Sequence, residues 1–391
     1  MTKKLLIHIG TGKTGISSIR RSALASSSNL SKNNIFYLGK FFEYNPNSSK
    51  AENNWFQKGA HYFRDHWEET IEEKFHQSLS ELICNQPEES VFFILNESLH
   101  HLHHPFALSL KTFQEKTGIQ IKIKAYARNH GNYSVSAYKQ WGLKHKTNTG
   151  PILSYTEWCQ RFEELFIRYG QQLKAWKKIF KENMTTYNYD QVENAISHFQ
   201  NVLREESNNP MVTMDNPEAR ANKTPSMDLL ILHALANHGI QQPALPEHLD
   251  KLLNRHPLPS PILAELDLNS LIPKPQEIQS LAISAAVQED QEIVNDLLNS
   301  SNEKSLVNLP EQYSNDQQSL AQHILLTKTI SNLLNILISQ DRSISKLEEN
   351  IQQLHDRLNK IDTQQKSNAT DSVDFNDNFF LYSRHGIRHQ E

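Results

Sequence analysis

A short glycine-rich segment near the amino terminus has the residue types of a phosphate-binding loop. The apolar run Leu5–Ile9 leads into Gly10-Thr11-Gly12-Lys13-Thr14-Gly15, and a stretch of helical character begins near Ser17. Glycines let successive backbone N–H groups point into one concavity, and the start of a helix adds positive potential there. Lys13 adds a full charge, and Ser17 and Ser18 offer hydroxyl donors. The segment therefore predicts an anion site, with phosphate as the expected group.

A second segment has the residues to hold another phosphate. The apolar run Ile121–Tyr126 is followed by Arg128, and Ser136 comes eight residues later in a stretch that predicts a helix. A guanidinium can clamp a phosphate with two parallel hydrogen bonds, and a serine on the next helix can add a third. Two such groups at strand ends of one sheet suit a nucleotide that carries phosphates at both ends.

The first loop departs from the motif of nucleoside triphosphatases. That motif requires a glycine, four residues and then Gly-Lys-Ser/Thr. Gly12-Lys13-Thr14 fits its end, but the first glycine falls at Ile7, inside the expected strand. A nucleotide kinase, which would also depend on Mg²⁺, is therefore disfavoured and stays an alternative.

Both segments resemble those of the sulfotransferases that use 3′-phosphoadenosine 5′-phosphosulfate (PAPS), in particular the bacterial-type and carbohydrate sulfotransferases. That family opens with His-Ile-Gly-x-x-Lys-Thr-Gly-Thr-Thr-Ser and reads the 3′-phosphate with a strand, an arginine and a serine. The resemblance covers roughly residues 4–200 and implies that Arg128 and Ser136 hold the 3′-phosphate. It implies that the 5′-phosphosulfate is held by Lys13, Thr14, Gly15, Ile16 (through its backbone), Ser17 and Ser18.

In two positions the loop departs from this family. Ile16 replaces a hydroxyl residue and Ser17 replaces a threonine, so one side-chain donor is lost. A non-catalytic scaffold, in which a decayed transferase domain carries an assembly helix, is therefore a further alternative. The retained Lys13, Arg128 and Ser136 argue against decay.

The chemistry that the resemblance implies is transfer of a sulfuryl group from PAPS to an acceptor hydroxyl, expected to belong to a carbohydrate, with no metal required. As in phosphoryl transfer, charge builds on the leaving phosphate, where Lys13 would stabilise it. A base must take the acceptor's proton. Glu97, just past the apolar run Val91–Leu95, is the first candidate, and His8 is the second. The alternative for Glu97 is a solvated carboxylate at the start of a helix. The alternative for His8 is a histidine that forms a hydrogen bond at the end of a strand.

Two other clusters of chemically active residues are weaker indications of a functional site. His100, His101, His103 and His104 lack the spacing of a helical metal-ligand set, so we expect no metal site there. Lys139, Lys144, His145 and Lys146 follow the Arg128 segment, where they either attract an anionic glycan or form a solvated helix end.

Alternating apolar and amphipathic stretches over residues 1–205 must position these groups. Strands are predicted at Leu5–Ile9, Ile35–Leu38, Val91–Leu95, Ile121–Tyr126 and Met184–Asn188. Helices are predicted at Ser17–Ala25, Trp67–Ile83, Pro105–Lys116, Val135–Leu143 and Thr156–Phe180. The alternation predicts an α/β fold, a P-loop-like three-layer domain with a central parallel sheet and its site at the carboxyl ends of the strands.

The chain changes character past residue 205. Prolines punctuate residues 206–316, an irregular and partly helical region that either completes the first domain or stands apart. Residues 317–363 predict a coiled-coil helix and a homo-oligomer, because Ile330, Leu337, Ile344, Ile351 and Leu358 recur every seven residues. A long helix packed on its own domain is the alternative. Residues 364–391 are expected to be a flexible tail.

Composition excludes several classes of protein. Of the 391 residues, 40 are Lys or Arg and 44 are Asp or Glu, which gives a net charge of −4. This charge excludes a generally basic protein that coats nucleic acid. Two cysteines, Cys84 and Cys159, are too few for a disulfide framework. No apolar run approaches the roughly 20 residues of a membrane span. We therefore expect a cytoplasmic protein.

Overall fold

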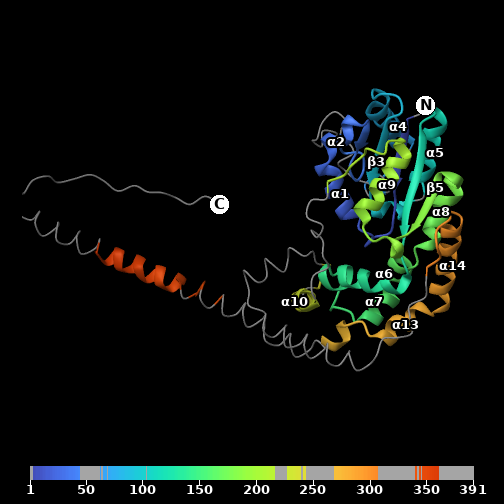
Figure 1. Ribbon diagram of the computed structural model, residues 1–391. Coiled ribbons are helices and arrows are strands. Elements are labelled where there is room, and N and C mark those ends of the chain that lie inside the picture. Colours follow the sequence, from blue (N-terminus) through green and yellow to red (C-terminus); the bar gives the residue numbers. More distant parts are fainter. Residues whose placement is uncertain are drawn as a thin grey trace, which may run out of the picture. The chain divides into compact units, whose positions relative to one another are not determined.

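The structure is a computed structural model, and it forms two units, Met1–Leu325 and Leu326–Glu391. It describes residues 3–44, 62, 65–67, 69–102, 104–215, 227–238, 241–243, 268–306, 340, 343–344 and 346–360. Figure 1 shows the labelled helices and strands of the first unit.

A single sheet of five parallel strands forms the centre of the first unit. Its strands are β1 (Lys4–His8), β2 (Ile35–Tyr37), β3 (Val91–Leu95), β4 (Gln120–Ala127) and β5 (Met184–Asn188), in the spatial order β2-β3-β1-β4-β5. Each predicted strand is confirmed to within one residue at either end. In the register of the sheet, His8 lies between Leu95 and Lys124, so the loops after β1, β3 and β4 leave from the same edge.

Helices cover both faces of this sheet (Figure 1). On one face, α1 (Ile16–Ala25) and α9 (Ala195–Ser207) pack Ile19 and Phe199 against Leu6 and Phe93 of the strands. Each such fully buried side chain stabilises the fold by about 1.5–3 kcal/mol. The other face holds α4 (Glu69–Cys84), α5 (Phe106–Thr117) and α8 (Gly170–Phe180). The fold class predicted from the sequence, a P-loop-like three-layer α/β domain, is confirmed.

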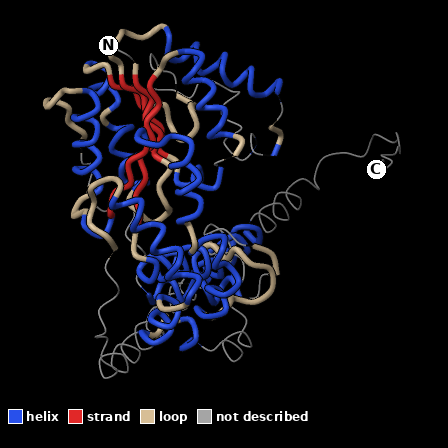
Figure 2. The backbone as a smooth tube through the Cα atoms, turned by 90° about the vertical axis from the view of Figure 1, so that its right-hand side faces the viewer, coloured by secondary structure: helices blue, strands red, loops and turns tan. Residues whose placement is uncertain are grey.

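A further group of helices lies beyond the carboxyl ends of the strands (Figures 1 and 2). Its members are α6 (His130–Ala137), the π-helix η3 (Tyr138–Lys144), α7 (Tyr155–Phe162), α10 (Met227–His238) and α13 (Pro275–Ala282). Two of these helices, α6 and η3, continue directly from the Arg128 segment, so the expected site at the strand ends faces them.

The prediction of one helix over Thr156–Phe180 is wrong, because the chain forms three shorter helices there. After α7 comes the π-helix η4 (Glu163–Ile167), the backbone leaves helical geometry at Arg168, and α8 begins at Gly170. The Asp290 carboxylate accepts hydrogen bonds from the backbone N–H groups of Gly170 (2.7 Å) and Gln171 (3.3 Å). It thereby supplies partners for the unsatisfied donors that a second helix start creates.

Another prediction needs a correction of the same kind. The helix expected over Val135–Leu143 begins earlier, at His130, because the Asn129 side chain accepts hydrogen bonds from the backbone N–H groups of Gly131 and Asn132. Asparagine is a favoured residue at this capping position. From Tyr138 the chain then winds as a π-helix, which sequence periodicity does not reveal.

The region after residue 205 contributes to the first unit through α14 (Ala285–Asn299). Asp290 on this helix also pairs with His130 Nε2 at 2.9 Å, and both side chains are fully buried. Just past α14, Ser301 Oγ accepts a hydrogen bond from the Thr186 N–H (3.0 Å), and the Asn188 amide donates to the Lys304 carbonyl (2.8 Å). Residues 285–304 therefore connect α6, α8 and the edge strand β5.

In the second unit the structure describes a helix over residues 346–360, part of the predicted coiled-coil segment. Five apolar side chains of this segment are 55–65% exposed: Ile344, Leu347, Ile351, Leu354 and Leu358. The remainder of that prediction and the predicted tail at 364–391 lie outside the described residues. No helix in the described part of the chain is both long enough and apolar enough to cross a bilayer.

Candidate functional site

The loop after β1 is tied to the end of β4. The Thr11 N–H and hydroxyl both donate to the Tyr126 carbonyl, at 3.3 and 3.2 Å, and the Thr14 hydroxyl donates to the Thr11 carbonyl at 2.6 Å. Lys13 and Gly15 have left-handed backbone conformations, with φ of 64° and 76°. Conformations of this hand aim consecutive N–H groups to one side, which is the geometry of an anion-binding loop.

At two positions of the loop, a residue larger than glycine would overlap neighbouring side chains. A Cβ at Gly15 would lie 2.6 Å from the Ala195 Cβ and 3.1 Å from the Tyr189 hydroxyl oxygen. A Cβ at Gly12 would lie 2.5 Å from the indole of Trp141 on η3. The loop therefore passes between α9, the end of β5 and the π-helix with no room for side chains at these positions.

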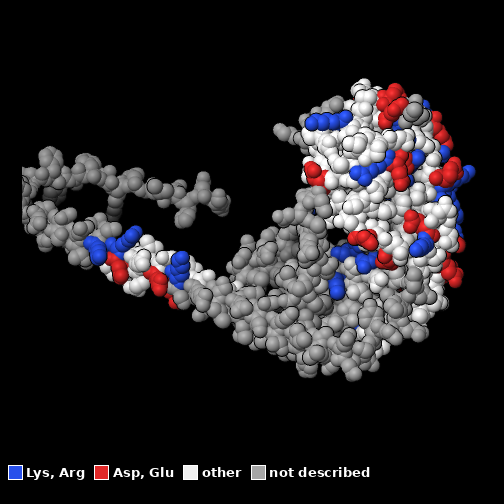
Figure 3. Space-filling view, viewed as in Figure 1, with Lys and Arg blue, Asp and Glu red and all other residues white. Residues whose placement is uncertain are grey.

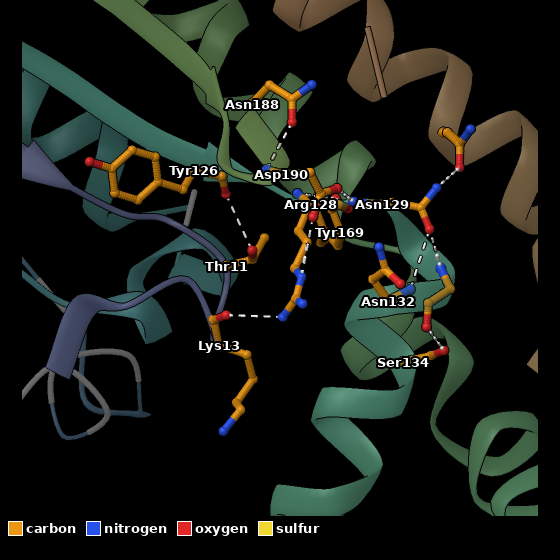
Figure 4. Close-up of polar contacts among 12 residues, drawn as sticks. Thr11, Lys13, Tyr126, Arg128, Asn129, Asn132, Ser134, Tyr169, Asn188 and Asp190 are labelled. Carbon is orange, nitrogen blue, oxygen red and sulfur yellow. Dashed lines mark hydrogen bonds and ion pairs between the residues drawn. The ribbon is translucent and has the colours of Figure 1, made fainter. Parts of the chain in front are cut away.

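Arg128 reaches the loop from the end of β4 (Figure 4). Its Nη1 donates to the carbonyl oxygen of Lys13 at 3.4 Å, and its Nε lies 3.4 Å from Asp190 Oδ1. The Tyr189 ring lies 5.9 Å from the guanidinium carbon. The structure thus brings together the two segments that the sequence singled out, although 115 residues separate them.

The backbone around Arg128 is fixed by the strand and helix that follow. Its N–H donates to the Tyr169 hydroxyl at 3.0 Å, and that hydroxyl donates back to the Arg128 carbonyl. Asp190 Oδ2 accepts from the Asn129 N–H at 2.7 Å, and the Asn188 side chain accepts from the Asp190 N–H. Asp190 therefore orients both the backbone and the guanidinium of this segment (Figure 4).

The hydroxyl groups predicted to bind phosphate differ in their engagement. The Thr14 hydroxyl is buried and donates within the loop, and the Ser17 hydroxyl accepts from Arg20 Nη2 at 3.1 Å. Ser18, on the first turn of α1, and Ser136, on α6, are half-buried, and neither hydroxyl has a hydrogen-bond partner among the described residues. These two hydroxyls are therefore available to a ligand.

Lys13 lies in a concentration of positive charge. Its Nζ donates to Gln140 Oε1 at 3.3 Å. Burial, with the neighbouring charges of Lys144, Arg128 and Lys139, lowers the pKa of Lys13 to about 8. Figure 3 shows Lys and Arg side chains gathered over α6, with acidic side chains beside them. Like charges held together in this way favour binding of an anion between them.

Glu97 is the first residue of the 3₁₀ helix η2 (Glu97–Leu102), directly after β3. Its side chain is 29% exposed, and its carboxylate pairs with Arg20 of α1, with Nη1 to Oε2 at 2.7 Å and Nη2 to Oε1 at 3.4 Å. Sequence reasoning missed Arg20, because no local pattern links two residues 77 positions apart. It also missed Gln140, whose one signal is its spacing of four residues from Ser136 on the same helical stretch.

His8 is buried beneath the loop and packs against aromatic side chains. Its ring centroid lies 4.7 Å from that of Tyr126 and 5.9 Å from that of Phe199, and its Nδ1 accepts from the Gly10 N–H at 3.2 Å. Burial lowers the pKa of His8 to about 3. A ring so buried and so weakly basic suits packing and hydrogen bonding beneath the loop better than proton transfer.

No cluster of three or more His, Cys, Asp or Glu side chains suited to a metal ion occurs in the ranges that the structure describes, which leave out His103.

Comparisons with known proteins return little. No family model matches the chain, and no curated protein matches its sequence. Among solved structures, the chain is similar to retinol dehydratase in complex with androsterone and the inactive cofactor PAP, at 11% sequence identity over 79% of this chain and 83% of that one, with a TM-score of 0.26. At this level of similarity the likeness carries no functional argument.

Replacing Gly15 by alanine is expected to lower the free energy of unfolding by about 2–5 kcal/mol, measured by urea denaturation. The left-handed backbone costs about 1–2 kcal/mol for a residue with a Cβ, and overlap with Ala195 adds about 1–3 kcal/mol.

Gly118→Ala is the matched control, because Gly118 has a φ of 73° and a Cβ there meets nothing within 4 Å. It should cost only the backbone part, about 1–2 kcal/mol. Equal losses in both variants would show that the contact with α9 does not constrain the loop.

Proposed function

We propose that this protein is a PAPS-dependent sulfotransferase. In this proposal PAPS is the donor substrate, and its 5′-phosphosulfate lies in the loop Lys13–Ser18 while its 3′-phosphate lies between Arg128 and Ser136. The observation that carries the proposal is the contact of the Arg128 guanidinium with the Lys13 carbonyl, because it joins the two segments that we propose to bind phosphate. A nucleotide with phosphates at both ends is the ligand that needs both.

The charges of the site support a polyanionic ligand. Lys13, Arg128, Lys139 and Lys144 interact electrostatically, and of these Arg128 has an ion pair with Asp190. Assembling such charges costs free energy in the free protein, since like charges repel. Two phosphate groups and a sulfuryl group would offset that cost, and the free hydroxyls of Ser18 and Ser136 would add neutral donors.

Each proposed residue has one task in the transfer. An acceptor oxygen forms a bond to sulfur while the bond between sulfur and the bridging oxygen breaks, and the electron pair of that bond stays on the 5′-phosphate. Lys13 donates a hydrogen bond to this oxygen and stabilises its developing charge. Glu97 accepts the proton of the acceptor hydroxyl. We assign this task to Glu97 rather than to His8 because the carboxylate is partly exposed and the imidazole is not.

The acceptor we propose is a carbohydrate hydroxyl, on family resemblance. A screen of oligosaccharides with ³⁵S-labelled PAPS identifies it directly. The two free cysteines, Cys84 and Cys159, suit a reducing compartment, and we place the protein in the cytoplasm.

Titration with 3′,5′-adenosine bisphosphate (PAP) and, separately, with ATP tests the ligand class, followed by thermal stability and calorimetry. We expect tight binding of PAP and weak binding of ATP. Arg128→Ala should weaken PAP binding by about 1.5–3 kcal/mol, the loss typical of a charged hydrogen-bond pair.

Arg161→Ala, at an exposed arginine on α7, is the matched control and should leave PAP affinity unchanged. A preference for ATP would support a nucleotide kinase, and binding of neither nucleotide would support a non-catalytic scaffold. Either outcome would overturn the proposal.

The ionisation of Lys13 should determine how kcat/KM falls at alkaline pH. Its pKa of about 8 in the free protein lies below the ordinary value of 10.5, so the ammonium is lost as pH rises through about 8. Since kcat/KM reports ionisations of the free enzyme, kcat/KM for PAPS should fall over the same range. Lys13→Ala should lower kcat by about 10²–10³-fold, with a smaller effect on PAP affinity.

Two variants check this assignment. Lys13→Arg keeps its charge at high pH, so its residual activity should lack the fall near pH 8. Lys181→Ala is the control, because the backbone of Lys181 also has a positive φ, of 48°, but its side chain is exposed and outside the site. Wild-type turnover in Lys13→Ala would remove Lys13 from the mechanism.

We also propose that the chain forms a parallel homodimer through its second unit. Ile344 and Ile351 occupy one row of the apolar stripe, and Leu347 and Leu354 occupy the complementary row. Isoleucine and leucine in these two rows favour two-stranded parallel coiled coils. A second copy of the same helix would cover side chains that are otherwise more than half exposed.

Sedimentation equilibrium of the full chain tests the dimer. Wild type should sediment at twice the chain mass, and Leu347→Lys with Leu354→Lys should sediment as a monomer, because two buried ammonium groups per helix oppose association. Gln352→Lys with Gln353→Lys adds the same charge off the stripe and should remain dimeric. A monomeric wild type at micromolar concentration would contradict the proposal.

A further inference from the structure

Arg20, on the first turns of α1, connects the phosphate loop to Glu97. Its Nη1 contacts Glu97 Oε2 at 2.7 Å, and its Nη2 contacts both Glu97 Oε1, at 3.4 Å, and Ser17 Oγ, at 3.1 Å. Its Nη1 also approaches the Leu95 carbonyl at 3.5 Å. Only 15% of the Arg20 side chain is exposed. The planar fork of an arginine can make these contacts at once, whereas a lysine ammonium cannot.

The backbone of Glu97 is held independently of this pair. The Asn96 N–H donates to the His8 carbonyl at 3.0 Å, which ties the end of β3 to β1. The Asn96 side chain accepts from the Ser98 N–H at 3.0 Å and fixes the start of η2. With the backbone placed, the direction of the carboxylate depends on what the side chain contacts, and its ion-pair partner in the structure is Arg20.

The two contacts to the carboxylate are unequal, and this inequality matters chemically. Oε2 makes a short charge-assisted hydrogen bond, whereas Oε1 lies at the long limit of one. Oε1 therefore retains the capacity to accept a proton from an acceptor hydroxyl. The positive charge of Arg20 also offsets the repulsion that a bare carboxylate would exert on an anionic donor held in the neighbouring loop.

We propose that Arg20 is a positioning residue that orients the Glu97 carboxylate. Through its contact with Ser17, it also fixes the position of that carboxylate relative to the donor loop. This inference rests on the proposed function, in which Ser17 contacts the donor and Glu97 accepts the proton. The structural alternative is an ion pair that merely fastens α1 to the end of β3. The two differ in whether Arg20 affects turnover only while Glu97 is present.

A double-mutant cycle separates them, with Arg20→Gln, Glu97→Gln and the double variant in the full chain. Turnover is measured with ³⁵S-labelled PAPS, using the oligosaccharide that gives the wild type its highest rate and, separately, water alone. Glu97→Gln should lower kcat by about 10²–10⁴-fold, and Arg20→Gln by about 10–10²-fold with KM for PAPS within about threefold. The double variant should be no slower than Glu97→Gln.

Two further variants serve as controls for the double-mutant cycle. Arg20→Lys keeps the charge but only part of the contacts, so its kcat should fall between those of wild type and Arg20→Gln even if the latter folds poorly. Arg21→Gln, at the exposed neighbouring arginine, should match wild type. If Arg20→Gln leaves kcat unchanged, or if it slows the Glu97→Gln background by its full factor, the inference is wrong.

The design also distinguishes failure of the inference from failure of the proposed function. PAP affinity and PAPS turnover of the wild type are measured first, and their absence would overturn the proposed function itself. When both are present, an additive cycle counts against Arg20 alone.

Discussion

The contact between the Arg128 guanidinium and the Lys13 carbonyl is the interaction on which the site depends. It holds a cation against a loop that already carries one, with Asp190 and Tyr169 keeping the arginine in place. The loop itself has left-handed backbone conformations at two residues, Lys13 and Gly15. Repelling charges and a strained backbone persist only when the surrounding structure holds them, and here the parallel sheet does so through aligned strand ends.

The sheet explains why segments far apart in sequence supply one site. Parallel strands in register deliver their following loops to one edge, and the order β2-β3-β1-β4-β5 puts β1 between β3 and β4. The loop after β1 therefore has Glu97 on one side and Arg128 on the other. In the proposed reaction this separates the proton acceptor from the group that holds the far phosphate, with Lys13 between them.

Much of this arrangement could be predicted from the sequence, because its signals are local. Apolar runs predicted the five strands, and the fold class follows from their alternation with helices. The loop at Lys13 and the Arg128 segment each have a recognisable composition. The break at Arg168 was not predictable, because the cap of α8 is Asp290, 120 residues away. The Arg20–Glu97 pair is non-local in the same way, and the partial burial that makes it matter depends on the packed fold.

The close approach of α9 to the loop after β1 limits how the chain can vary at this point. The space that a side chain at position 15 would need is already filled by the Ala195 methyl group and the Tyr189 hydroxyl. Positions 15 and 195 therefore share one small volume, although they lie far apart in the sequence. A relative with a larger residue at position 195 must move α9 outward from the sheet, and the space beside the loop after β1 would change with it.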